Sequence, residues 1–156
     1  MIEKYQKPAE FYDGLRLHQN ENTGGCSPRV LAALASLSAQ QVGFYPPYNA
    51  ATQTCAAYLG VDADRLSLVN GLDEGIMATA VAYLRSRPGQ PPAEAIIPEP
   101  AFEIFAFDTE VVGGLPVRIA PNPDYSFPLD RVLAAITANT RVVFLTSPNN
   151  PTGVSI

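Results

Sequence analysis

Two asparagines between two prolines form the part of this 156-residue chain whose side chains are best placed to bind a ligand. The apolar residues 142–145 are followed by Thr-Ser-Pro-Asn-Asn-Pro-Thr-Gly, a pattern that predicts a central strand ending in a rigid turn. Pro148 and Pro151 fix their own φ angles and restrict the residues before them, so Asn150 has little backbone freedom. An amide beyond the carboxyl end of such a strand can hydrogen-bond a ligand. An ordinary polar connection from a strand to a helix remains an alternative.

A glycine at the start of a predicted helix is suited to bind an anion. A short strand at residues 66–69 is predicted to run through Gly71 into an amphipathic helix whose inward face includes Ile76 and Leu84. Such a helix start exposes backbone N–H groups and the positive end of the helix dipole, which bind phosphate. Asp73 also suits the first turn of any helix, and its charge would oppose a nearby anion.

Two aromatic residues lie close to prolines. Phe102 follows Pro100 at the start of the helix predicted at residues 101–112, where the plainest role of its ring is to pack the helix start against the core. Tyr45 lies in a loop at residues 43–48 that contains two prolines and three aromatic rings. Exposed rings in a rigid loop often form an interface, and packing within the same chain is an equal alternative.

Strands and helices alternate along the chain, which favours an α/β fold with a mainly parallel sheet and right-handed crossovers. Pro116 predicts that its strand lies at an edge of the sheet. Ser27 is expected to cap the first helix. We expect the apolar face of this helix to be part of the core, and it consists of Val30, Leu31, Leu34 and Leu37. Further strands are predicted at residues 95–97, 115–119 and 141–146, and further helices at residues 49–59 and 129–138.

Composition and charge exclude several classes of function. The net charge is −5, the pI is about 4.7 and the ten basic residues are scattered, so nucleic acid is not an expected partner. The amino terminus lacks the apolar core of a signal peptide, and no apolar run is long enough to cross a bilayer. We therefore expect a cytoplasmic protein with no membrane partner. Cys26 and Cys55 have no metal-binding or redox spacing, so no metal is expected.

The turn Ser-Pro-Asn-Asn-Pro-Thr-Gly at residues 147–153 resembles the hallmark turn of fold-type I pyridoxal-phosphate (PLP) aminotransferases, in particular of the histidinol-phosphate aminotransferase branch. The resemblance implies that Asn150 bonds the phenolic oxygen of the cofactor. Gly71, Leu72 and Asp73 resemble the start of the family's Gly-x-Asp-Glu turn, whose backbone amides hold the PLP phosphate. The resemblance therefore predicts the PLP-transferase fold of type I, with three layers and a mainly parallel sheet.

Three further segments are similar to the same family. Phe102 matches an aromatic residue that stacks on the pyridine ring, and Tyr45 matches a tyrosine that touches the cofactor phosphate of the other subunit in a homodimer. Asn20 and Asn22 belong to a segment similar to the Asn-Glu-Asn segment that lines the substrate mouth. The chain departs from the family after Asn22, where Thr-Gly-Gly-Cys replaces a common proline, and a solvated loop stays an alternative for this segment.

The catalytic groups of the family are not matched. The only lysines are Lys4 and Lys7, and neither matches the family's Schiff-base lysine. We therefore expect the amino-terminal part of an aminotransferase, truncated after the Asn-Pro-Thr-Gly turn. Residues 1–40 would form the amino-terminal arm and first helix, at the substrate mouth, and residues 41–156 the first part of the large PLP-binding domain. The chain alone would be poorly soluble and would not transaminate an amino or oxo acid.

Two alternatives remain open from the sequence. A PLP-dependent decarboxylase of the same fold would share these motifs. A non-catalytic module that binds a phosphate-bearing ligand through residues 71–73, or that serves in assembly, would share the helix start. A Ser-Lys pair followed by an arginine in the continuation of the chain would distinguish an enzyme from a binding module.

Overall fold

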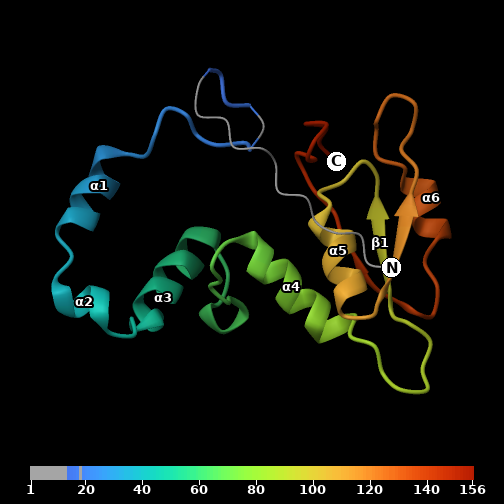
Figure 1. Cartoon of the computed structure of the whole chain (residues 1–156), viewed down its shortest axis with the longest axis horizontal. Coiled ribbons are helices and arrows are strands. Elements are labelled where there is room, and N and C mark those ends of the chain that lie inside the picture. The colour runs from blue at the N-terminus through green and yellow to red at the C-terminus, as the bar shows by residue number, and fades with distance from the viewer. Residues whose placement is uncertain (1–13, 18) are drawn as a thin grey trace. The chain divides into compact units, whose positions relative to one another are not determined.

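The computed structural model describes residues 14–17 and 19–156 (Figure 1). The described chain divides into two compact units, with the boundary between Leu68 and Val69. In the described residues, no helix has the length and apolar character needed to span a membrane.

The unit from Val69 onward is built on three parallel strands in the order β2-β1-β3. The parallel sheet confirms the predicted α/β class. Among these strands β2 lies at one edge, as its proline predicts. β3 pairs with β1 and lies at the other edge of the strands described, and its predicted central position in a larger sheet stays a prediction. The elements in chain order are α4 (Leu72–Tyr83), β1 (Glu94–Pro98), α5 (Ile104–Val111), β2 (Leu115–Ile119), α6 (Leu129–Ala134) and β3 (Thr140–Val143).

Side chains that alternate along β1 form the core on both faces of the sheet. Ile96 packs with Ile119 and Val132 of α6 on one face. Ile97 packs on the other face, in a cluster with residues of α4 and α5 that includes Ile76 and Phe105. Successive residues of a strand point to opposite faces, so α6 covers one side of the sheet while α4 and α5 cover the other. These helices and the sheet between them form three layers, as predicted.

The unit that ends at Leu68 is helical in its described residues. Its elements are α1 (Pro28–Ala35), α2 (Ala39–Gly43), α3 (Tyr48–Leu59) and the 3-10 turn η1 (Ala63–Arg65). Ser27 accepts a hydrogen bond from the Arg29 amide at the start of α1, as predicted for a cap. Gly60 ends α3 with a φ of 69°, in the left-handed region.

Two predictions for this part of the chain are wrong. The apolar face of α1 is exposed, with Leu34 at 59 %, because among the described residues of this unit only Ala56 is buried and no second apolar layer covers the helix. Residues 66–69 form no strand, since in the described sheet every strand lies after residue 93 and none pairs with them.

Candidate functional site

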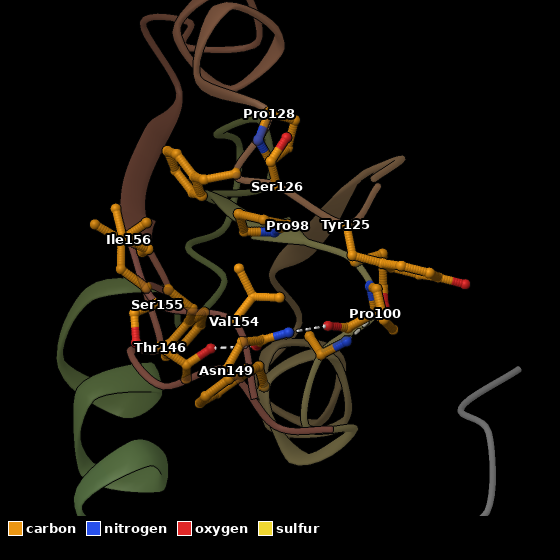
Figure 2. Close-up of a pocket in the computed structure, with 16 residues that line it drawn as sticks. Pro98, Pro100, Tyr125, Ser126, Pro128, Thr146, Asn149, Val154, Ser155 and Ile156 are labelled. Carbon is orange, nitrogen blue, oxygen red and sulfur yellow. Dashed lines mark hydrogen bonds between the residues drawn. The ribbon is translucent and has the colours of Figure 1, made fainter. Parts of the chain in front are cut away.

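The carboxyl ends of β1 and β3 lie side by side at one end of the parallel strands, the place where open α/β folds bind ligands. The segment after β1 contains Pro100 and Phe102, and the segment after β3 contains the turn with Asn150. The side-chain Nδ2 of Asn149 donates a hydrogen bond of 2.9 Å to the carbonyl oxygen of Pro100, so the two segments are tied together (Figure 2). We call this region the carboxyl edge.

Asn149 is the residue that fixes the turn, and the sequence analysis missed it. Its Oδ1 accepts a bond from the hydroxyl of Thr146, and its Nδ2 also donates to the hydroxyl of Thr152 at 3.1 Å. Its backbone N–H donates to the carbonyl of Val154 at 2.7 Å. The threonine three residues to either side was the available signal, because short polar side chains bond each other across a turn.

The neighbouring Asn150 is half-buried, and within the described residues its side-chain amide has no hydrogen-bond partner. The two adjacent asparagines therefore differ in their side-chain hydrogen bonding. The amide of Asn149 is occupied by the turn, whereas the amide of Asn150 is available to a ligand. The role of Asn150 in ligand binding stays a prediction.

The start of α4 presents backbone donors on the same unit. Gly71 precedes the helix with a φ of 81° and a ψ of 170°, and it offers no side chain to cap the first turn. In the described part of the chain, no acceptor is bound to the N–H groups of Leu72 or Asp73, and both residues are exposed. The carboxylate of Glu74 is held by Asn70, whose side-chain Nδ2 donates to it at 3.0 Å. The first turn of α4 can therefore bind an oxyanion.

An aromatic cluster joins these features. The half-buried ring of Phe102 meets the ring of Phe105 edge to face at 5.9 Å, and Phe105 stacks on Phe144 at 4.5 Å. Phe102 and Phe144 both pack against the core cluster that contains Ile76 of α4. Phe102 therefore packs against α4 at Ile76, and Phe102 lies two residues after Pro100, to which Asn149 of the turn is bonded.

The remaining predicted site residues lie in the other unit. Tyr45 is fully exposed, at 100 %, in the loop before α3. Asn20 is exposed, with a φ of 52°. Asn22 closes a local turn, because its Oδ1 accepts from the N–H of Gly24 at 3.1 Å and its Nδ2 donates to the carbonyl of Gly25 at 2.7 Å.

An ion pair that the sequence analysis missed supports the segment after β1. Glu99 Oε2 accepts a bond of 3.1 Å from the N–H of Ala101, and Glu99 Oε1 pairs with Arg118 of β2 at 2.6 Å.

The cavity beneath the segment after β1 has a volume of only about 40 Å³, which suits water rather than an aromatic ring (Figure 2). A ligand as large as an aromatic ring therefore does not fit inside this cavity.

Asp108 of α5 is a buried carboxyl close to the start of α4. Burial, and secondarily the negative charge of Asp73, raise the pKa of Asp108 above its ordinary value of 3.8. The native state then keeps a proton at pH values where the unfolded chain has lost it. The stabilising effect of this proton is complete below about pH 3.8 and is lost as the pH rises through the raised pKa.

We expect the variant Asp108→Asn to be more stable than the wild type at pH 7, because the amide needs no proton when it is buried. The difference in the free energy of unfolding should shrink as the pH falls toward 4. Urea unfolding at a series of pH values measures this difference. A difference that stays the same from pH 7 to pH 4 would show that the carboxyl titrates normally.

The backbone at Gly71 gives a second prediction. Its φ of 81° and ψ of 170° lie in a region that is essentially confined to glycine, so Gly71→Ala should lower the free energy of unfolding by about 1–3 kcal/mol. Gly75, inside α4, is the control. A Cβ there would lie 3.5 Å from Val69 Cγ2, an ordinary contact, and Gly75→Ala should stabilise the helix by about 0.5–1 kcal/mol. Urea unfolding of both variants checks the opposite signs, and equal effects would contradict the strain at Gly71.

Comparison with known proteins identifies the family of the chain. Residues 12–156 match the family model for aminotransferase class I and II. The chain is 34 % identical over 157 residues to a histidinol-phosphate aminotransferase of Moorella thermoacetica, with 99 % of this chain and 39 % of that protein covered. It is 36 % identical to histidinol-phosphate aminotransferase 2 of Pseudomonas fluorescens, over 89 % of this chain and 36 % of that protein.

Solved structures lead to the same family. The structure of N-succinyldiaminopimelate aminotransferase from Mycobacterium tuberculosis superposes with a TM-score of 0.68 at 25 % identity, and the match covers 83 % of this chain and 36 % of that one. The chain thus spans about two fifths of the length of the relatives it matches. These matches lead to one conclusion, because the family model covers nearly the whole sequence and the relatives carry the same family name. The chain belongs to the aminotransferase class I and II family.

Proposed function

We propose that the whole protein is a PLP-dependent aminotransferase of the histidinol-phosphate type, and that this chain supplies contacts to the cofactor. The relatives named above as histidinol-phosphate aminotransferases favour this activity over the decarboxylase alternative. The observation that supports the proposal is the packing of Phe102 against the cluster that contains Ile76 of α4, a helix whose first N–H groups have no acceptor among the described residues. The side-chain amide of Asn150 likewise has no partner there.

Residues at the start of α4 and at the carboxyl edge would bind the three chemical parts of PLP. The N–H groups of Leu72 and Asp73, next to Gly71, would hold the phosphate, since helix N-termini favour anions. The ring of Phe102 would stack on the pyridine, and the amide of Asn150 would bond the phenolic oxygen. Asn149 would act as a positioning residue, because its bonds to Pro100 and Thr152 fix the turn.

When bound, PLP withdraws electrons from the substrate carbon at which a bond is broken. The residues described above bind and orient the cofactor. The only lysines of the chain, Lys4 and Lys7, lie outside the described residues and match no catalytic position of the family. The contribution of this chain that we propose is therefore cofactor binding.

The other proposals concern the whole protein. Tyr45 would reach the cofactor phosphate of the second subunit of a homodimer, in keeping with its full exposure. Asn20 and Asn22 would line the mouth of the site for an amino- or oxo-acid substrate. Residues 1–40 would belong to the arm and small domain, and residues 41–156 to the large domain. The protein would act in the biosynthesis of amino acids in the cytoplasm.

Titration with pyridoxine 5′-phosphate tests the proposal. This molecule has the ring and the phosphate of PLP but no aldehyde, so it cannot react with Lys4, Lys7 or the amino terminus. We expect it to raise the melting temperature of the chain, because a ligand that binds only the folded state stabilises it. Pyridoxine without phosphate should have a much smaller effect. Equal melting temperatures with and without pyridoxine 5′-phosphate would contradict the proposed site.

A further inference from the structure

A second cavity lies at the opposite end of the strands, where β1 and β3 begin. It is formed by the loop between α4 and β1 and by the start of β3, and the loop is the yellow-green segment at the bottom of Figure 1. Its volume is about 240 Å³, which is room for a small metabolite. We call it the arginine cavity, and its polar lining consists of Arg85, Arg87, Arg141, Tyr83, Gln90 and Asn139.

The charged side chains that line the arginine cavity are all positive. Three guanidinium groups line it and no acidic side chain does, although the whole chain carries a net charge of −5. Among the described residues, neither Arg85 nor Arg87 forms an ion pair or a side-chain hydrogen bond. The carboxylate of Glu94, at the start of β1, accepts bonds from the hydroxyls of Thr137 and Thr140 instead. Like charges repel one another, so the group that complements this cavity is an anion.

Arg141 is held in a fixed position by the backbone. Its Nη1 donates to the carbonyl oxygens of Ala138 and Thr140, at 2.7 and 3.0 Å. These bonds orient the planar guanidinium and leave the donors on Nη2 and Nε for a ligand. A guanidinium that is already oriented loses less conformational entropy when it binds an oxyanion.

Interaction with the helix dipole does not account for the cluster. Arg85 follows Leu84, the last cap residue of α4, and a cation is favourable at a helix C-terminus. That argument covers Arg85 alone. Arg87 lies farther along the loop and Arg141 comes from β3, so their approach to the same cavity needs another reason.

We propose that the arginine cavity binds a small multivalent oxyanion that carries phosphate or carboxylate groups. This site is separate from the carboxyl edge, because a five-residue strand such as β1 spans about 16 Å between its two ends. Guanidinium forks match the geometry of both phosphate and carboxylate. The ligand therefore has at least two anionic groups, one for the fixed Arg141 and one for the pair Arg85 and Arg87.

Calorimetric titration of the chain with pyrophosphate and, separately, with citrate tests the proposal and distinguishes phosphate from carboxylate ligands. We expect at least one of them to bind. The double variant R85Q/R87Q should raise its Kd by about tenfold or more, because two charge-assisted contacts are lost. The double variant R29Q/R65Q removes the same charge from exposed positions of the other unit and should change the Kd by less than about twofold.

A third variant keeps the positive charge but replaces the planar guanidinium group, with its paired N–H donors, by an ammonium group. Arg141→Lys should weaken the same ligand severalfold while the net charge stays constant. The thermal unfolding of all variants shows that they are folded before they are titrated. The proposal is overturned if neither anion binds the wild type at millimolar concentration, or if R85Q/R87Q and R29Q/R65Q weaken binding equally, which would indicate an effect of overall charge.

Discussion

The variant Phe105→Ala is expected to lose about 3–5 kcal/mol of the free energy of unfolding, as is usual when a buried aromatic side chain is truncated. Phe105 is 5 % exposed and contacts the rings of both Phe102 and Phe144. Its removal leaves a cavity between α5 and β3 and removes the edge contact that orients Phe102. Urea unfolding followed by circular dichroism measures the loss.

Phe105→Leu is the matched control because leucine fills much of the same volume without a ring. Its loss of stability should be about 1–2 kcal/mol. Leucine keeps the apolar contact with the core but cannot stack on Phe144. A loss of less than about 1 kcal/mol in Phe105→Ala would show that the aromatic cluster does not stabilise this unit.

The adjacent asparagines should respond to alanine in opposite ways. Asn149→Ala removes three side-chain hydrogen bonds, to Pro100, Thr146 and Thr152, and should lower the free energy of unfolding by about 2–3 kcal/mol. Asn150→Ala removes no hydrogen bond of the described residues and should change stability by less than about 0.5 kcal/mol. Each variant serves as the control for the other.

The binding of pyridoxine 5′-phosphate gives the complementary result. Asn150→Ala should weaken binding about 3- to 10-fold, since one hydrogen bond to the ligand is lost while the turn stays intact. Calorimetric titration measures the change. If Asn150→Ala binds like the wild type, or if it destabilises the chain as much as Asn149→Ala does, the assignment of the two amides is wrong.

Local signals in the sequence were sufficient for most of the sheet. Pro116 cannot donate to a neighbouring strand, which predicts an edge position for the strand at residues 115–119, and β2 has these limits and this position. Residues 66–69 have a similar apolar composition and form no strand. The prediction of a strand at residues 66–69 fails for a physical reason. A strand is stable only when another strand pairs with it, and a short sequence does not specify its partner.

The same limit explains what the sequence analysis missed at the site. Asn150 could be selected because its neighbours are informative, but the role of Asn149 depends on a carbonyl oxygen 49 residues away. The apolar stripe of α1 was visible in the sequence, whereas the absence of a layer over it in this unit was not. The arginine cavity joins Arg85 and Arg87 to Arg141, which come from separate segments, so no local pattern revealed it.

A crystal structure of the chain with pyridoxine 5′-phosphate measures most directly whether the carboxyl edge is one cofactor site. The expected result is a phosphate within hydrogen-bond distance of the N–H groups of Leu72 and Asp73, a pyridine ring stacked on Phe102, and the phenolic oxygen bonded to Asn150. If the molecule binds elsewhere, or if these three groups face separate regions of solvent around it, the proposed cofactor site is wrong.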